Sequence, residues 1–392
     1  MKLDPQAWLA RPGIRRLLKA LHADQGIARF VGGAVRDLLL GEEPGDLDLA
    51  TTHTPEEVIR LLEAAGIKAI PTGIEHGTIT AVSSNTVVEI TTLRADVSTD
   101  GRRATVAFTD DWQADASRRD FTINALYADP FTGEVHDYFG GMADLKARTV
   151  RFIGEPLQRI AEDHLRILRY FRFHARYGDG APDADALDAC TARANDLMAL
   201  SRERIADELL KLLSLADPSP TIALMHARGL FAPVIPEIAT TERLAGLIAS
   251  ERAAAIAANP VRRLAALLPP DPATADRVAA RLKFSNKAKK RLASAADPDL
   301  GLNPRALAYR IGSAEAVDRL LLAGNAEDAA ALKDWPVPRL PVGGAQMMAR
   351  GIDQGPRIAK TLRAIEDRWV AEGFPEGAAF DAIVDAAVAS AQ

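Results

Sequence analysis

The sequence has a single cysteine, Cys190, and few aromatic residues, which make up only 5% of its 392 residues. One thiol cannot form an internal disulfide, and it excludes the cysteine-rich zinc sites of small metal-binding domains. No apolar stretch approaches the roughly 20 residues that span a bilayer, so no membrane partner is expected. The seven histidines form no recognisable ligand set. These absences favour a cytoplasmic protein without disulfides.

Hydrophobic residues make up 48% of the chain, enough for buried cores, and this excludes a largely disordered protein. The formal net charge of −5 argues against histone-like, indiscriminate binding of nucleic acid. Short β-rich runs alternate with helical patterns up to about Leu145, whereas alanine, leucine and helix-breaking clusters dominate from about Glu155 onward. The sequence therefore predicts an α/β head with one sheet, followed by an all-helical remainder. The strand candidates are 28–31, 46–50, 78–82, 86–92, 105–108 and 134–138.

Two adjacent glycines, Gly32 and Gly33, follow the first predicted strand and precede a helix. Glycines at such a turn let the backbone approach a phosphate, and the helix that follows offers unpaired N–H groups to an anion. No Gly-Lys-Ser/Thr sequence follows, so this is not a Walker loop. Taken alone, an ordinary tight turn is the alternative.

Asp46 and Asp48 lie two residues apart in the second predicted strand, so their side chains point the same way. Two carboxylates on one side of a strand repel each other unless a cation lies between them, and oxygen ligands of this kind suit Mg²⁺. A solvated strand face is the alternative. Together with the glycine turn just upstream, however, the pair offers a phosphate cradle and a metal site in one module, which is the equipment for nucleotidyl transfer.

Residues Phe30 to Thr51 resemble the first motif of the class II tRNA nucleotidyltransferase and bacterial poly(A) polymerase family, which belongs to the polymerase-β-like nucleotidyltransferase superfamily. Three further motifs of that family have counterparts in order, at 118–126, 140–145 and 162–169. The resemblance covers about residues 28–176. It implies a polymerase-β-like α/β head, with a mixed sheet and helices, followed by an all-helical neck, body and tail.

The resemblance also implies roles for individual residues. Asp46 and Asp48 would hold the catalytic Mg²⁺ ions, and Asp163 and Arg166 would read the edge of the incoming base. A third carboxylate is common in the superfamily. Glu89 is the candidate because it lies between β-branched residues of a strand; Asp120 competes with it, and Glu89 could equally occupy an exposed strand position. The expected nucleotide-binding set is Gly32, Gly33, Arg36, Arg119, Asp120, Asp163, Arg166, Arg169 and Arg172.

Residues 160–176 fit one continuous helix, at about 100° per residue. On it, arginines 166, 169, 172 and 176 form one band, and Asp163 and Arg166 are neighbours on its edge. A carboxylate beside a guanidinium presents mixed acceptors and donors to a base. The alternative is an amphipathic helix with a solvated arginine face and a Glu162–Arg166 pair.

A second basic run contains no acid and only one aromatic residue, so it suits RNA phosphates better than stacked bases. A solvated helix face is the alternative. The expected RNA contacts are Lys283, Lys287, Lys289, Lys290 and Arg291, with Arg277 and Arg281 beside them.

The sequence thus predicts an enzyme that adds C, C and A from CTP and ATP to the tRNA 3′ end, with Mg²⁺ as cofactor and no obligatory protein partner. Poly(A) polymerase and CC-only or A-only relatives are alternatives within the family, and a catalytically inactive RNA-binding protein is an alternative outside it. The expected domains are an N-terminal helix packing on the head (1–27), the catalytic head (28–150), a neck (151–215), an RNA-binding body (216–320) and a tail (321–392).

Overall fold

The computed structural model describes residues 2–100, 103–301, 303–352 and 355–391. The chain divides into two compact units, one up to Ser201 and one from Arg202 onward. This boundary cuts the expected neck, because helix α10 (Arg202–Leu213) packs on α13 (Pro260–Leu267) of the second unit. The finer division into body and tail stays a prediction.

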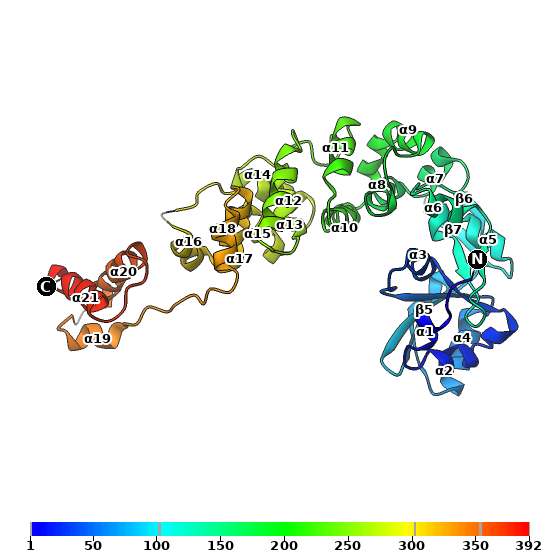
Figure 1. Cartoon of the computed structure of the whole chain (residues 1–392), viewed down its shortest axis with the longest axis horizontal. Helices are drawn as coiled ribbons and strands as arrows, with labels where there is room; N and C mark the ends of the chain where they lie inside the picture. Colours follow the sequence, from blue (N-terminus) through cyan, green and yellow to red (C-terminus); the bar gives the residue numbers. More distant parts are fainter. Residues whose placement is uncertain (1, 101–102, 302, 353–354, 392) are drawn as a thin grey trace. The chain divides into compact units, whose positions relative to one another are not determined.

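The first unit, coloured blue to green in Figure 1, contains a seven-stranded sheet. The strand order is β3-β4-β5-β2-β1-β8-β9, with β2 and β5 parallel and the other neighbours antiparallel. This mixed sheet confirms the predicted fold class of the head. The sequence did not predict β3, β6 and β8. The strands are β1 (Ala28–Val31), β2 (Leu47–Thr51), β3 (Lys68–Gly73), β4 (Thr78–Ser83), β5 (Thr86–Thr92), β8 (Leu126–Ala128) and β9 (Val135–Asp137), with a separate hairpin of β6 (Arg94–Asp100) and β7 (Arg103–Phe108).

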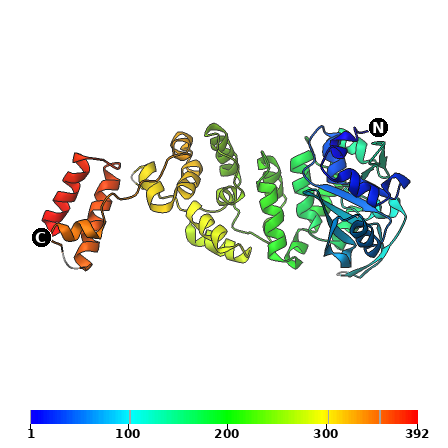
Figure 2. The same cartoon turned by 90° about the horizontal axis from the view of Figure 1, so that it is seen from below.

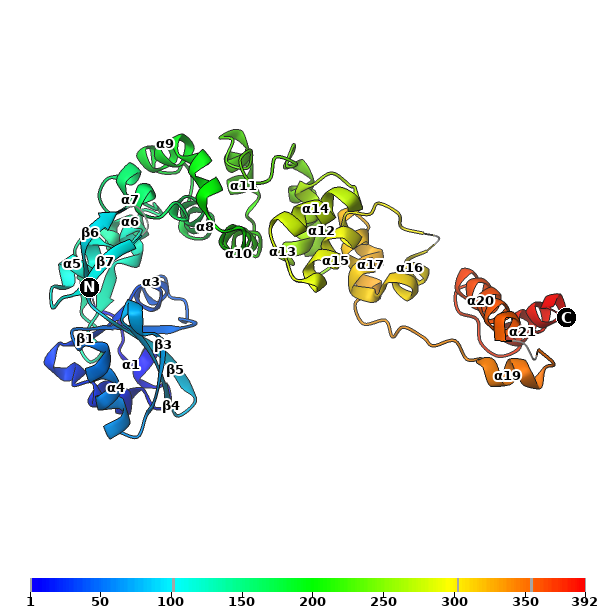
Figure 3. The ribbon, with the colours of Figure 1, turned by 180° about the vertical axis from the view of Figure 1, so that it is seen from behind.

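One face of this sheet is a continuous apolar layer. Phe30, Leu49, Ile90 and Ile79 pair in register across β1, β2, β5 and β4, and each is at most 1% exposed. The Trp8 ring lies 4.6 Å from that of Phe30. Because side chains alternate along a strand, the residues between these face the opposite side of the sheet, where the candidate site lies. The covering helices are α1 (Gln6–Leu9), α2 (Ile14–Ala20) and α4 (Pro55–Ala64), two of which are labelled beside the strands in Figure 3.

The single N-terminal helix expected over 1–27 is wrong, because α1 and α2 are separate short helices. Pro12 and Gly13 interrupt them, and Gly13 has a φ of 77°, in the left-handed region that favours glycine. Other helices of the first unit are α3 (Gly33–Leu39), α5 (Trp112–Ser117), α6 (Gly141–Lys146), α7 (Pro156–Glu162), α8 (Arg166–Tyr177) and α9 (Ala184–Ala192).

The described part of the second unit forms helices without strands, as expected (Figure 2). Three of them begin in the same way: Asn259, Asp271 and Asn303 cap the backbone N–H groups of the first turn, and a proline follows each cap. Besides α10 and α13, the helices are α11 (Ser219–Ala227), α12 (Glu242–Ala253), α14 (Pro272–Arg281), α15 (Asn286–Ala295), α16 (Pro304–Ile311), α17 (Ser313–Leu322), α18 (Ala326–Leu332), α19 (Gly344–Ala349), α20 (Gly355–Ala371) and α21 (Ala378–Ala391).

A buried charge cluster holds α12, α13, α15 and α17 together. Arg262 binds both Glu251 and Asp318, and all three are at most 2% exposed. Arg263 joins Glu251 at 2.8 Å, and Arg291 joins Asp318 at 2.6 Å. Buried ion pairs of this kind fix one packing arrangement more than they add stability. Among the described residues, no helix is both long and apolar enough to cross a membrane.

Candidate active site

The glycine turn joins β1 to α3. Gly32 has φ 66° and ψ −121°, a conformation that a residue with a side chain rarely adopts. A Cβ atom on Gly32 would lie 3.6 Å from Nη1 of Arg119 and 3.6 Å from the Asn124 carbonyl oxygen. On Gly33, a Cβ would lie 3.5 Å from Nη2 of Arg36. The turn therefore lies close to two guanidinium groups, which favour an anion beside it.

The paired carboxylates lie beside this turn. Asp46 directly precedes β2 and is exposed, whereas Asp48 is the second residue of β2 and is partly buried. Asp48 is paired with Glu89 of β5 in the parallel register, which places Glu89 on the same face. The β1–β2 register, with Phe30 opposite Leu49, brings the end of β1 level with Asp48. Asp46, Asp48 and Glu89 therefore flank the strand end from which the glycine turn leaves.

The electrostatics of Asp48 fit a cation. Burial, followed by the nearby charge of Glu89, raises the pKa of Asp48 to about 6, although Arg119 partly opposes the shift. Among the described residues, no three His, Cys, Asp or Glu side chains converge closely enough to bind a metal by themselves. Mg²⁺ usually binds through one or two carboxylates and completes its shell with water and substrate phosphates. Asp46 and Asp48 therefore fit a divalent cation whose other ligands are water and the oxygens of a triphosphate.

Arg119, an expected nucleotide contact, is held from two sides. Its Nε donates to the Tyr127 hydroxyl at 3.1 Å, and its Nη2 donates to Asp115 at 3.3 Å. Nη1 lies next to Gly32. The sequence analysis missed Asp115, although its spacing of four residues from Arg119 is that of a helical ion pair.

Asp120 does not join the carboxylates of the candidate metal site. Its Oδ2 accepts Nε and Nη2 of Arg169, at 2.8 and 2.5 Å, and its Oδ1 accepts the Asn124 amide at 3.0 Å. Asn124 in turn accepts Nη1 of Arg36, whose guanidinium lies 4.1 Å from the Tyr177 ring centre. Asp120 thus links α8 to α3, and Glu89 stays the candidate third carboxylate.

The continuous helix expected over 160–176 is wrong. Helix α7 ends at Glu162, and Asp163 is extended, with φ −150° and ψ 107°. The Asp163 carboxylate accepts the Leu165 N–H at 3.1 Å, and its carbonyl accepts the Arg166 N–H at 3.0 Å. Aspartate competes for backbone N–H groups in this way, which makes it a poor residue for a helix interior. Asp163 therefore lies at the junction of α7 and α8 and not on one helical face with Arg166.

Arg166 forms the Glu162 pair that the sequence offered as an alternative, with Nη1 at 2.5 Å from the carboxylate. The same guanidinium donates to the carbonyl oxygens of Arg159, at 2.7 Å, and Arg118, at 3.3 Å. Arg159 in turn donates to the Arg119 carbonyl oxygen at 2.7 Å. The expected base-reading segment is therefore hydrogen-bonded to the backbone of Arg118 and Arg119, and Arg119 borders the glycine turn.

The remaining expected arginines gather around one aromatic ring. The guanidinium carbons of Arg36, Arg169 and Arg172 lie 5.4, 5.4 and 4.5 Å from the centre of the Phe173 ring. Sequence reasoning missed Phe173, because an aromatic residue on a helix usually signals only the core. The structure thus brings these three arginines of two distant segments together.

The basic run of the second unit meets acids from other segments. Arg281 pairs with Glu237, Lys283 with Glu203, Lys289 with Asp276 and Arg291 with the buried Asp318. Arg291 is therefore part of the packing of α15 on α17. Lys287 and Lys290 are exposed, and no ion pair joins either to an acid in the described part of the chain. These two lysines are the members of the run best placed for RNA phosphates.

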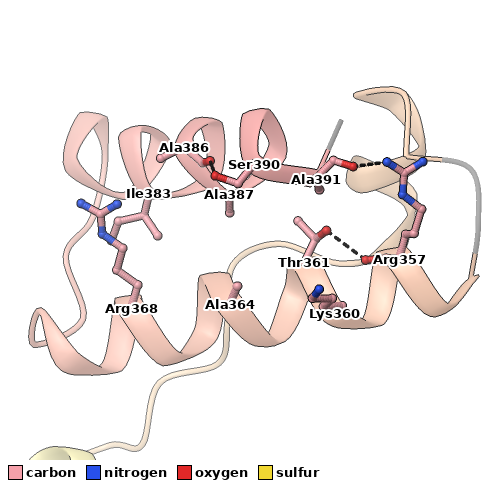
Figure 4. Close-up of a pocket in the computed structure, with 10 residues that line it drawn as sticks. All are labelled: Arg357, Lys360, Thr361, Ala364, Arg368, Ile383, Ala386, Ala387, Ser390 and Ala391. Atoms are coloured by element: carbon pink, nitrogen blue, oxygen red, sulfur yellow. Dashed lines mark hydrogen bonds between the residues drawn. The ribbon is translucent and has the colours of Figure 1, made fainter.

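A groove of about 480 Å³ lies between α20 and α21 (Figure 4). Arg357, Lys360 and Arg368 border it, and alanines form much of its floor. Arg357 already donates to the Ala391 carbonyl oxygen, and Arg368 binds Glu372 at 2.7 Å. None of the described residues that line the groove carries a carboxylate, so they form no second candidate metal site.

The raised pKa of Asp48 predicts a pH-dependent gain in stability when its charge is removed. The folded protein binds this proton more tightly than the unfolded chain, so ionisation of Asp48 destabilises the metal-free fold as the pH rises from about 4 through 6. Asp48→Asn should therefore raise the unfolding free energy at pH 7.5 by roughly 1–3 kcal/mol and have little effect at pH 4. Urea titrations in EDTA test this.

Asp46→Asn is the matched control, because Asp46 is exposed and its substitution should change stability much less. If the change in unfolding free energy caused by Asp48→Asn is the same at pH 4 and at pH 7.5, the pKa of Asp48 is not raised in the folded protein.

Comparison with known proteins identifies the family and the fold. Residues 28–151 match the family model of the poly(A) polymerase head domain, and residues 181–241 match that of a probable RNA- and SrmB-binding site of polymerase A. The chain is 37% identical to the mouse mitochondrial CCA tRNA nucleotidyltransferase 1 over 92% of its length and 87% of that protein. It is 40% identical to the CCA-adding enzyme of Staphylococcus epidermidis over 50% of this chain and 48% of that one. The crystal structure of the Bacillus stearothermophilus CCA-adding enzyme with CTP superposes with a TM-score of 0.74 at 27% identity, covering 96% of this chain and 98% of that one. The chain therefore belongs to the family of CCA-adding enzymes and bacterial poly(A) polymerases.

Proposed function

We propose that this chain is a CCA-adding tRNA nucleotidyltransferase, which adds C, C and A from CTP and ATP to the tRNA 3′ end. The observation that carries the proposal is the position of Asp46 and Asp48 beside the Gly32 turn and the Arg119 guanidinium. The relatives support it, because the mouse enzyme matches over nearly the whole of both chains. A cytoplasmic location stays a prediction of the same proposal.

The chemistry follows from these residues. Asp46 and Asp48 would hold Mg²⁺, which lowers the pKa of an attacking 3′-hydroxyl and offsets the charge of the leaving pyrophosphate. Gly32 lets the backbone approach the triphosphate, and the Arg119 guanidinium would place a positive charge beside the phosphates. Glu89, level with Asp48 on β5, would assist as a third carboxylate.

Base selection is assigned to the α7–α8 junction. Asp163 offers acceptors and Arg166 offers donors, and a base that left such groups unpaired would be disfavoured. Arg169 is fixed by Asp120, and Arg172 lies against Phe173, so these two arginines of α8 would contact the nucleotide from the same helix. Lys287 and Lys290 would contact RNA phosphates without reading sequence.

The proposal predicts a defined product. With tRNAs that lack all three, the last two or only the last nucleotide of the CCA end, the chain should use CTP for the first two and ATP only for the last. Gel analysis and sequencing of the products test this. Asp46→Asn should reduce the rate by at least about 10³-fold, while the affinity for tRNA stays unchanged.

Each other outcome has a defined meaning. Long runs of added A would identify a poly(A) polymerase, and addition of C alone or A alone would identify a partial enzyme. Failure to add any nucleotide in Mg²⁺, with tRNA still bound, would identify an RNA-binding protein without catalysis.

Arg166→Ala tests base selection separately from catalysis. We expect the preference for CTP and ATP over UTP and GTP to fall by about tenfold or more, because a charged donor to the base is lost. Arg176→Ala is the control, since Arg176 lies on the same helix but is exposed and pairs with Asp37 and Glu42. Equal nucleotide preferences in both variants and the parent would show that Arg166 does not read the base.

A further inference from the structure

A buried carboxylate that the proposed chemistry does not use lies behind Arg119. The Asp115 residue is 1% exposed. Its Oδ1 accepts the Arg94 backbone N–H at 3.1 Å and Nη2 of Arg118 at 2.6 Å. Its Oδ2 accepts the Tyr127 hydroxyl at 2.7 Å and Nη2 of Arg119 at 3.3 Å. These donors come from four different residues, and most of them lie outside the short helix α5, so Asp115 does more than anchor that helix.

Through Oδ2, the carboxylate sets the direction of Arg119. The Tyr127 hydroxyl donates to Asp115 and accepts Nε of Arg119, so the acid, the phenol and the guanidinium form a closed triangle. The remaining nitrogen, Nη1, is the one next to the glycine turn at Gly32. Without Asp115, the Tyr127 phenol would be the only described group hydrogen-bonded to this guanidinium.

Through Oδ1, the same carboxylate holds the base of the β6–β7 hairpin. Arg94 is the first residue of β6, and Leu93 before it donates to the Thr51 carbonyl oxygen at the end of β2. Directly after β7, the Thr109 N–H donates to the Leu93 carbonyl oxygen at 3.0 Å. The hairpin base and Arg119 therefore share one anion.

We infer that Asp115 is a positioning residue, which aims Arg119 at the nucleotide triphosphate and couples that contact to the base of the β6–β7 hairpin. The inference rests on the proposed function, because it requires a triphosphate beside Gly32. Because Asp115 itself is only 1% exposed, we expect it to make no contact of its own with the nucleotide. Its substitution should therefore weaken nucleotide binding mainly through Arg119, because Nη1 of that guanidinium lies next to Gly32.

The first test compares two variants of the same helix by equilibrium titration with CTP in Mg²⁺. Asp115→Asn keeps the shape but removes the charge, and it should raise the Kd for CTP about tenfold while the Kd for tRNA changes less than twofold. Asp111→Ala is the matched control, since Asp111 caps the Gln113 and Ala114 N–H groups of α5 and does not contact Arg119. If both variants weaken CTP binding equally at equal loss of Tm, Asp115 is only structural and the inference is overturned.

A double-mutant cycle tests the route through Arg119. In an Arg119→Ala background, Asp115→Asn should change the Kd for CTP by less than twofold, because the group that it positions is absent. Independent, multiplying effects would overturn the inference. If Asp115→Asn does not fold, Tyr127→Phe in both backgrounds replaces it, since that change removes one side of the same triangle.

Amide hydrogen exchange tests the coupling to the hairpin. CTP should slow exchange of the Arg94 amide in the parent and not in Arg119→Ala. Equal slowing in both would overturn the coupling.

A parent chain that binds CTP but adds no nucleotide would refute the proposed function and leave this test intact. An active parent whose CTP affinity is unaffected by Asp115→Asn would refute only the inference.

Discussion

The head depends on two buried carboxylates, Asp115 and Asp120, which lie on either side of the Arg118–Arg119 pair in the sequence and bind arginines. Asp115 fixes the two arginine side chains, and Asp120 fixes Arg169 of α8. The backbone of the pair is held as well, because its carbonyl oxygens accept Arg166 and Arg159. One short segment thus connects the glycine turn to α8 and to the α7–α8 junction, for which we propose base selection.

The acids of this protein fall into two electrostatic classes. Burial alone would raise the pKa of Asp115 and Asp120, but the arginines beside them lower it. Among the described residues no arginine forms an ion pair with Asp48, and burial together with the nearby acids raises its pKa. A partly buried acid left without a bound cation is destabilising for the fold, and such an arrangement is typical of a functional site. The direction of the pKa shift therefore distinguishes Asp115 and Asp120, which bind arginines, from Asp48, for which we propose a cation.

Local patterns predicted much of this from the sequence. The alternation around Asp46 and Asp48 predicted their strand, and the glycine pair predicted the turn beside it. What failed depends on distant segments or on a local competitor of the helix. The ion pair of Arg291 was not predicted because Asp318, which binds it, is 27 residues away, and a role for Arg291 in RNA binding stays a prediction. The break at Asp163 arises because its carboxylate takes a backbone N–H that a continuous helix would use.

The central claim is that Asp46 and Asp48 bind a divalent cation together with the triphosphate at the glycine turn. Anomalous diffraction from crystals grown with Mn²⁺ and CTP measures this directly. The account predicts a manganese peak in contact with both carboxylates and with the triphosphate, next to Gly32 and Arg119. A peak elsewhere, or a triphosphate bound away from this turn, would contradict it.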